Sequence, residues 1–246
     1  MRLKGKVAVI TGGATGIGGA TAQLFGSEGA TSIILDYNEK EGHANLARIK
    51  KAGGEGEFHQ IDVREEAQVK NAFSKIAGKH GKIDTMVISA GILTGAYSTV
   101  TELAEQDWND TIDTNLKGTF LTAKHSAPLL TASASSVLLI IASGAGVFGG
   151  SSSYAYAASK AGQSGFYNKL HEDLPNTRTH LVCPGSIATP LKLKNVGQGA
   201  ETRGEDPEIA MTEARESLGD PMGIAHILTF LASDEADYVR GIIRTR

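Results

Sequence analysis

Short, nearly continuous apolar runs alternate with longer amphipathic segments along the chain. The apolar runs are expected to form β-strands at residues 7–11, 31–36, 57–62, 83–89, 137–142 and 179–183. The other segments are expected to form helices at residues 16–28, 39–52, 65–79, 105–130, 154–174, 207–217 and 221–232. Strands that are apolar on both faces are typical of a parallel sheet covered by helices on both sides. The pattern therefore predicts one α/β domain over residues 1–246, a doubly wound parallel sheet flanked by helices on both faces.

One stretch interrupts the alternation. Residues 186–204 are polar and contain glycines, and they follow the end of a predicted strand. Doubly wound sheets bind ligands at the carboxyl ends of their strands. We therefore expect an irregular segment here that begins a mobile lid over a substrate, extending over about residues 186–219.

Composition and charge narrow the class of ligand. The chain has 246 residues, is 41% hydrophobic and carries a formal net charge of -3. This charge, without a basic stripe, argues against nucleic acid or an anionic membrane surface as the main partner. The apolar runs are far shorter than the ~20 residues that span a bilayer, and the first residues do not resemble a signal peptide. We expect a cytoplasmic protein with a small-molecule partner.

Cysteine and histidine give little support to a metal site. Cys183 is the only cysteine, so an intramolecular disulfide is impossible and a cysteine-based zinc site is implausible. We expect Cys183 to be a small buried apolar residue. The histidines lack ligand spacing, and His171 and His180 are expected at the surface or at strand ends. The sequence predicts no metal.

A glycine-rich turn joins the first predicted strand to the first helix. Gly12, Gly16 and Gly18 lie where a backbone must approach a pyrophosphate closely. The N–H groups and dipole at a helix N-terminus also favour phosphate. A tight structural turn is the alternative, but the order of strand, turn and helix favours a dinucleotide-binding domain of Rossmann-like type.

Asp36, at the end of the second predicted strand, indicates which dinucleotide is bound. A carboxylate there can accept hydrogen bonds from the adenosine ribose hydroxyls and repels a 2′-phosphate. No Lys or Arg occupies positions 37, 38 or 11–18, so NAD is predicted rather than NADP. The alternative is a capping role for Asp36 before the following helix. Asp62 and Val63 could bracket the adenine, with capping again as the alternative.

Tyr156 and Lys160 form the most informative pair in the chain. Residues four apart lie on the same face of a helix, so the phenol and the ammonium can lie side by side. Such an arrangement makes tyrosine a usable acid and base. Tyr154 would face elsewhere. Ser143 precedes Tyr156 by thirteen residues, although it could be only a strand-end serine.

These motifs together resemble the short-chain dehydrogenase/reductase family over essentially the whole chain. The resemblance rests on an ordered set of matches: Thr11, Gly12, Gly16, Ile17, Gly18, Asp62, Val63, Ala90, Gly91, Asn115, Ser143, Tyr156, Lys160, Pro184, Gly185 and Thr189. Enoyl-reductase relatives carry a tyrosine seven residues before the lysine, where this chain has Ser153. A carbon–carbon double-bond reductase is therefore disfavoured.

The resemblance implies catalytic roles. Tyr156 would be the acid and base, and the charge of Lys160 would lower its pKa from about 10. Ser143 would stabilise charge on the substrate oxygen, and Asn115 would hold a water that relays protons from Lys160. The implied cofactor-binding residues are Gly12, Thr15, Gly16, Ile17, Gly18, Asp36, Asp62, Val63, Ser89, Ala90, Gly91, Tyr156, Lys160, Pro184, Gly185, Ile187 and Thr189.

The chain departs from the family pattern in three places. The connection after the predicted helix at 154–174 is slightly shortened, and it carries His180 where the family often has asparagine. Ile88 and Ser89 replace two asparagines that follow the fourth strand in the family, which puts local rigidity in doubt. The last strand, before residue 246, is expected to be short or remodelled. The resemblance also implies a homo-oligomer, a tetramer or dimer formed through the helices at 105–130 and 154–174.

The leading hypothesis is therefore an NAD(H)-dependent oxidoreductase that interconverts a secondary alcohol and a ketone. An NADPH-dependent carbonyl or 3-oxoacyl reductase is the alternative enzyme, and the relative affinities for NAD(H) and NADP(H) separate the two. A non-catalytic dinucleotide-binding sensor or scaffold is the alternative of another class. Such a protein would bind a cofactor without turning over any alcohol or ketone.

Overall fold

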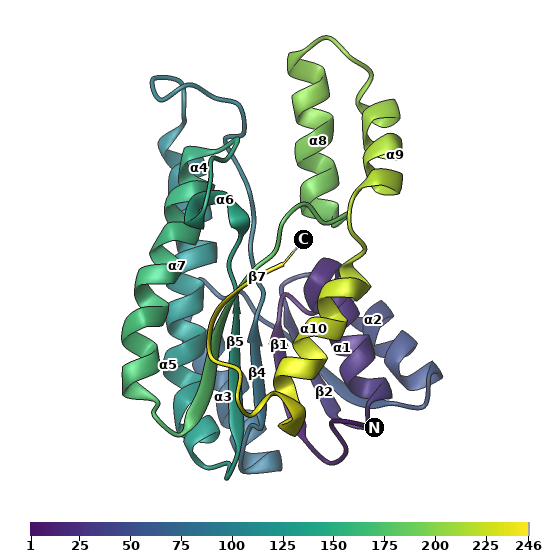
Figure 1. Ribbon diagram of the computed structural model, residues 1–246, viewed down its shortest axis with the longest axis vertical. Coiled ribbons are helices and arrows are strands. Elements are labelled where there is room, and N and C mark those ends of the chain that lie inside the picture. The colour runs from purple at the N-terminus through teal and green to yellow at the C-terminus, as the bar shows by residue number, and fades with distance from the viewer. Residues whose placement is uncertain (246) are drawn as a thin grey trace.

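Within residues 1–245, the part of the chain described by the computed structural model, seven parallel strands form one sheet (Figure 1). The strands are β1 (Val7–Thr11), β2 (Thr31–Asp36), β3 (Glu55–Gln60), β4 (Thr85–Ile88), β5 (Ser136–Ile141), β6 (Thr177–Cys183) and β7 (Gly241–Arg244). Their order across the sheet is β3-β2-β1-β4-β5-β6-β7. The order changes direction between β1 and β4, which confirms the predicted doubly wound parallel sheet.

Helices connect the strands and cover both faces of the sheet. They are α1 (Gly16–Ser27), α2 (Glu39–Lys51), α3 (Glu66–His80), α4 (Glu105–Ile112), α5 (Gly118–Thr131), α6 (Gly144–Val147), α7 (Tyr154–Asp173), α8 (Pro190–Thr202), α9 (Pro207–Ser217) and α10 (Pro221–Ala232). A π-helical turn, η1 (Asp113–Lys117), joins α4 to α5, and a 3₁₀ turn, η2 (Asp234–Ala236), follows α10. Among the described residues, no helix combines the length and apolar character needed to cross a membrane.

Two apolar cores lie on opposite faces of the sheet, because successive side chains of a strand point to opposite sides. On β6, Leu181 and Cys183 face the core shared with α3, α5 and α7, whereas Val182 faces the core shared with α1, α2 and α10. Cys183 is fully buried, as predicted, and burial raises the pKa of its thiol. The sequence placed the sheet correctly because both faces of most strands are apolar.

Some predicted boundaries were wrong. The third strand occupies Glu55–Gln60 rather than 57–62, because its pairing with β2 begins at Glu55 opposite Thr31. This strand lies at the edge of the sheet and is less apolar than the central strands, so periodicity located it poorly. The predicted helix at 105–130 is divided by η1, which has no signal in the hydrophobic pattern.

The segment expected to be irregular is mostly helical. Thr189 caps α8 by accepting a hydrogen bond from the backbone N–H of Lys192, and Pro190 occupies the first turn. Both are ordinary signals of a helix start, but glycines inside the segment masked them. In Figure 1, α8 and α9 stand side by side beyond the carboxyl ends of the strands. Their role as a lid stays a prediction.

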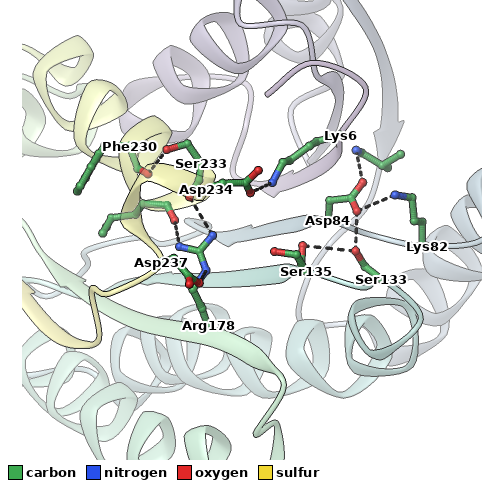
Figure 2. Close-up of polar contacts among 12 residues, drawn as sticks. Lys6, Lys82, Asp84, Ser133, Ser135, Arg178, Phe230, Ser233, Asp234 and Asp237 are labelled. Carbon is green, nitrogen blue, oxygen red and sulfur yellow. Dashed lines mark hydrogen bonds and ion pairs between the residues drawn. The ribbon is translucent and has the colours of Figure 1, made fainter. Parts of the chain in front are cut away.

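A buried arginine ties the end of α10 to the sheet (Figure 2). Arg178 donates hydrogen bonds to the carbonyl oxygens of Leu231 at 3.0 Å and Ser233 at 2.9 Å. A cation at the end of a helix donates hydrogen bonds to the last carbonyls and interacts favourably with the negative end of the helix dipole. His180, two residues further along β6, is fully buried in mid-strand, so its predicted place at the surface or a strand end was wrong. The predicted short last strand is confirmed, since β7 has four residues.

Candidate functional site

A cleft of about 1000 Å³ opens at the carboxyl ends of the strands. It is lined by most of the residues that the sequence indicated: Gly12, Thr15, Gly16, Ile17, Asp36, Asp62, Val63, Ser89, Ala90, Gly91, Ser143, Tyr156, Lys160, Pro184, Gly185, Ile187 and Thr189. Gly18 and Asn115 do not line it; both are buried. The fold thus brings together residues from β1, β2, β4, β5, α7 and the lid segment.

The glycine-rich turn between β1 and α1 has little side-chain bulk of its own to cover its backbone. Gly12 has a φ of +67°, and a Cβ there would lie 2.7 Å from the backbone nitrogen of Ala90. Gly16, also in the left-handed region at φ +57°, begins α1. A side chain at Gly18 would collide with the carbonyl of Gly12. The turn therefore fits a phosphate group, because it presents a helix N-terminus with little side-chain bulk.

Asp36 lies at the edge of this turn and is 8% exposed. Its carboxylate accepts hydrogen bonds of 3.0 Å from the backbone N–H groups of Ala14 and Asn38. Asn38, rather than Asp36, caps α2. The carboxylate therefore caps the turn before α2, as one alternative predicted, and also lines the cleft at the end of β2. Its contact with a cofactor stays a prediction.

Arg64 is a cleft residue that the sequence analysis missed. It forms ion pairs with Asp62 at 2.7 Å and with Asp110 at 3.1 Å. Its hydrogen bonds hold the pKa of Asp62 below the usual range, against the effect of partial burial. The pairing with Asp62 could have been suspected from a spacing of two residues, but Asp110 comes from α4 and is adjacent only in the folded chain.

Ser143 and Ser153 each cap the helix that follows, and these caps fix the local backbone at Ser143 and Tyr156. Ser143 follows β5, and its hydroxyl accepts a hydrogen bond from the backbone N–H of Ala145. Ser153 caps α7 by accepting from the backbone N–H of Tyr156, and its own hydroxyl donates to the carbonyl of Thr94. Ser153, which stands where enoyl-reductase relatives carry a tyrosine, therefore fixes the start of α7.

Tyr156 and Lys160 share one face of α7. The Nζ of Lys160 lies 5.5 Å from the centre of the Tyr156 ring, and the lysine is only 4% exposed. Tyr154, by contrast, is half exposed and does not line the cleft. The spacing argument therefore selected the tyrosine that faces the lysine.

The electrostatics of the pair differ from the sequence-based expectation. Burial lowers the pKa of Lys160 to about 8. Burial also raises the pKa of Tyr156, and the Ser143 hydroxyl opposes this rise. The ammonium of Lys160 donates to the Ile141 carbonyl at 2.9 Å and to the side chain of Gln163 at 3.1 Å, instead of to the phenol. The expected lowering of the Tyr156 pKa is therefore not what this arrangement gives.

Asn115 lies in η1, behind the cleft. Its side-chain oxygen accepts from the backbone N–H of Ile92 at 2.8 Å, and its side-chain nitrogen donates to the Ile92 carbonyl and to Ser159. These bonds join the loop after β4 to α7. The backbone carbonyl of Asn115, to which the resemblance assigned no contact, accepts from Thr119 and Gln163.

The substitution at residues 88 and 89 is accommodated locally. Ile88 is buried in the core at the end of β4. The backbone N–H of Ser89 lies 3.2 Å from both the carbonyl and the hydroxyl of Thr11, which ties β4 to β1. Ser89 also lines the cleft. The two residues therefore maintain the strand edge without amide side chains.

Tyr97 connects α8 to Ser152, which also lines the cleft, and the sequence analysis missed it. Its hydroxyl donates to the backbone carbonyl of Asn195 in α8 at 3.2 Å, and its backbone N–H donates to the carbonyl of Ser152. The side chain of Asn195 donates to the Ser152 hydroxyl at 2.9 Å. Tyr97 has a φ of +64°, a conformation that non-glycine residues rarely adopt. We call Tyr97, Ser152 and Asn195 the lid clasp.

Comparison with known proteins agrees with this geometry. A family model described as short chain dehydrogenase matches residues 6–198. The 3-oxoacyl-acyl-carrier-protein reductase of Thermotoga maritima is 34% identical over 243 residues, which cover 98% of this chain and 96% of that protein.

Two solved structures superpose over nearly the full length. Levodione reductase gives a TM-score of 0.90 at 26% identity, covering 99% of this chain and 96% of that one. An actinorhodin polyketide ketoreductase variant, solved with NADPH, gives a TM-score of 0.89 at 26% identity, covering 98% and 95%.

Proposed function

Since this chain belongs to the short-chain dehydrogenase family, we propose that it is an NAD(H)-dependent oxidoreductase that interconverts a secondary alcohol and a ketone. The observation that carries the proposal is the placement of Ser143, Tyr156 and Lys160 together in one cleft, which the carboxylate of Asp36 also lines. A nicotinamide dinucleotide, when bound, supplies or accepts the hydride.

The chain's own residues would hold that cofactor at two points. The bare turn at Gly12 and the N-terminus of α1 suit the pyrophosphate. Asp36 suits the ribose hydroxyls and disfavours a 2′-phosphate through charge repulsion. This carboxylate supports NAD over NADP.

Tyr156 would exchange the proton at the substrate oxygen. Because burial raises its pKa, the phenol carries its proton at neutral pH, which is the form that ketone reduction requires. Ser143 would donate a hydrogen bond to the same oxygen and stabilise its developing charge. In alcohol oxidation, the ammonium of Lys160 would favour the phenolate across the 5.5 Å that separates it from the ring centre.

An NADPH-dependent carbonyl or 3-oxoacyl reductase is the second candidate. It is favoured by the relatives, since one is a 3-oxoacyl reductase and another was solved with NADPH. Separate titrations with NADH and NADPH distinguish the two candidates. Tighter binding of NADPH would favour the second and would contradict the role assigned to Asp36.

The decisive test is turnover by Tyr156→Phe on the best substrate from a panel of secondary alcohols and ketones, followed through nicotinamide absorbance. We expect kcat to fall roughly 10²–10⁴-fold, while NADH affinity stays near that of the unsubstituted protein. Tyr154→Phe is the matched control, because Tyr154 is half exposed and outside the cleft. Full turnover by Tyr156→Phe would refute the mechanism. Cofactor binding without turnover of any compound would instead indicate a sensor or scaffold.

A further inference from the structure

Gln163 is a buried polar residue one helical turn after Lys160, and it is 1% exposed. Its side-chain oxygen accepts a hydrogen bond from the Nζ of Lys160 at 3.1 Å. Its side-chain nitrogen donates to the backbone carbonyl of Asn115 at 2.9 Å and to the hydroxyl of Thr119 at 2.8 Å. The amide thus uses both donor hydrogens and one acceptor in a site with no access to solvent.

The partners fix which way round this amide lies. An ammonium can only donate a hydrogen bond, and a backbone carbonyl can only accept one. The oxygen of Gln163 must therefore face Lys160, and its nitrogen must face Asn115. In the flipped orientation, the amide nitrogen of Gln163 would face the ammonium of Lys160 and its oxygen would face the carbonyl of Asn115, so neither hydrogen bond could form.

The Asn115 carbonyl is fully occupied by this arrangement. It accepts from the Thr119 hydroxyl at 2.6 Å as well as from Gln163, and a carbonyl oxygen has two lone pairs. A water that relays protons between Lys160 and this carbonyl would have to displace one of these donors. Gln163 makes the same connection with a side chain.

We propose that Gln163 is a positioning residue that links Lys160 to the Asn115 carbonyl in place of a water, and so keeps the lysine charged and fixed beside Tyr156. The inference rests on the proposed function, because it assigns Lys160 a part in the chemistry of Tyr156. Since an amide does not readily pass protons along, Lys160 must exchange its proton on the side that faces the cleft.

The groups around Lys160 determine how easily its ammonium loses a proton. Tyr156 faces the ammonium from the same helix, and Cys183 faces it from β6. The Ile141 carbonyl at the end of β5 is its other acceptor. Among residues 1–245, the hydrogen-bond partners of its ammonium include no carboxylate, and burial lowers the pKa of Lys160 to about 8. The Gln163 oxygen is therefore one of two neutral acceptors that oppose loss of the proton.

The test is the titration of Lys160, followed by NMR of labelled lysine side chains and assigned by the signal lost in Lys160→Met. Gln163→Met preserves approximate volume and removes all three hydrogen bonds. We expect it to lower the pKa of Lys160 by roughly one unit. Gln163→Glu places a carboxylate in the same position, and we expect it to raise that pKa. Asn168→Met, on the exposed face of the same helix, should leave it unchanged.

Opposite shifts in the two variants would not follow from a purely structural role, which predicts lower stability in both. An unchanged Lys160 pKa in folded Gln163→Met would overturn the proposal. If that variant does not fold, an unchanged or lowered pKa in Gln163→Glu would overturn it equally. The titration needs no turnover, so it can fail or succeed independently of the proposed function. With an active enzyme, the pH profile of alcohol oxidation by Gln163→Met should shift to higher pH, because less ammonium supports the phenolate.

Discussion

The carboxylate of Asp36 accepts a hydrogen bond of 3.0 Å from the backbone N–H of Ala14, which joins the end of β2 to the glycine-rich turn. The same group is both a structural acceptor and a negative charge in the part of the cleft where we propose that the cofactor binds. Asp36→Asn removes the charge and keeps one acceptor: the amide oxygen can still accept from Ala14, while the hydrogen bond from the backbone N–H of Asn38 is lost.

We expect Asp36→Asn to raise affinity for NADP(H) relative to NAD(H) by about tenfold or more, because like-charge repulsion is removed. Titrations monitored by nicotinamide fluorescence measure the ratio. Asp62→Asn is the control, since the charge of Asp62 is already paired with Arg64. An unchanged ratio in Asp36→Asn would show that Asp36 does not select the cofactor.

The lid clasp depends on a glycine. A Cβ at Gly199 would lie 2.5 Å from the hydroxyl oxygen of Tyr97, so alanine there must displace the tyrosine. We expect Gly199→Ala to raise KM for the best substrate several-fold with a smaller change in kcat. Steady-state kinetics measure both. Gly78→Ala is the matched control, because a Cβ at Gly78 meets no atom within 4 Å. If Gly199→Ala behaves like the control, the clasp does not shape the substrate side of the cleft.

A buried carboxylate should contribute to stability. Asp84 accepts hydrogen bonds from the Val7 backbone N–H at 2.8 Å, from Lys82 at 2.8 Å and from Ser133 at 2.6 Å (Figure 2). Burial opposes its ionisation, but these donors outweigh burial and lower the pKa of Asp84. We expect Asp84→Asn to reduce the free energy of unfolding by about 1–3 kcal/mol.

The pH dependence of this contribution has a definite sign. Because the pKa of Asp84 is lower in the folded state, its stabilisation is present above the unfolded value of about 3.9. It is lost as the pH falls through the folded value. Urea unfolding of Asp84→Asn should therefore approach that of the unsubstituted protein only in acid. Asp234→Asn, which removes an 80% exposed partner of Lys6, should cost about 1 kcal/mol at most. An equal loss in both variants would contradict the prediction.

His180 should make the fold sensitive to mild acid. Neither ring nitrogen has a hydrogen-bond partner among the described residues. Burial, followed by the charge of Arg178, lowers the pKa of His180 to about 4. An unfolded histidine binds a proton below about 6.5, so the unfolded state binds more protons between these two values. Stability should consequently fall as the pH falls through this range, by about 3 kcal/mol at most.

His180→Leu should remove most of this acid sensitivity, as measured by the midpoint of thermal unfolding between pH 7 and about 4.5. His226→Leu is the control, because His226 is exposed on α10. A similar acid slope in His180→Leu and in the unsubstituted protein would exclude His180 as its source.

The sequence by itself determined the features that depend on local spacing. Alternating apolar runs and helices were enough for the doubly wound sheet, because the periods of strands and helices are fixed by backbone geometry. The glycine turn before Gly16, the position of Asp36 and the pairing of Tyr156 with Lys160 were found for the same reason. Each involves residues within one element or at its end.

Only the tertiary structure decided the contacts between distant segments. Gln163 reaches Asn115 across 48 positions and Tyr97 reaches Asn195 across 98, so neither pair leaves a periodic signal in the chain. The burial of His180 and the direction of the Tyr156 pKa shift likewise depend on which elements pack over them. Hydrophobic periodicity determines which face of an element is covered, but the packed fold determines what covers it, and that decides the charge and hydrogen bonding of the Tyr156–Lys160 pair.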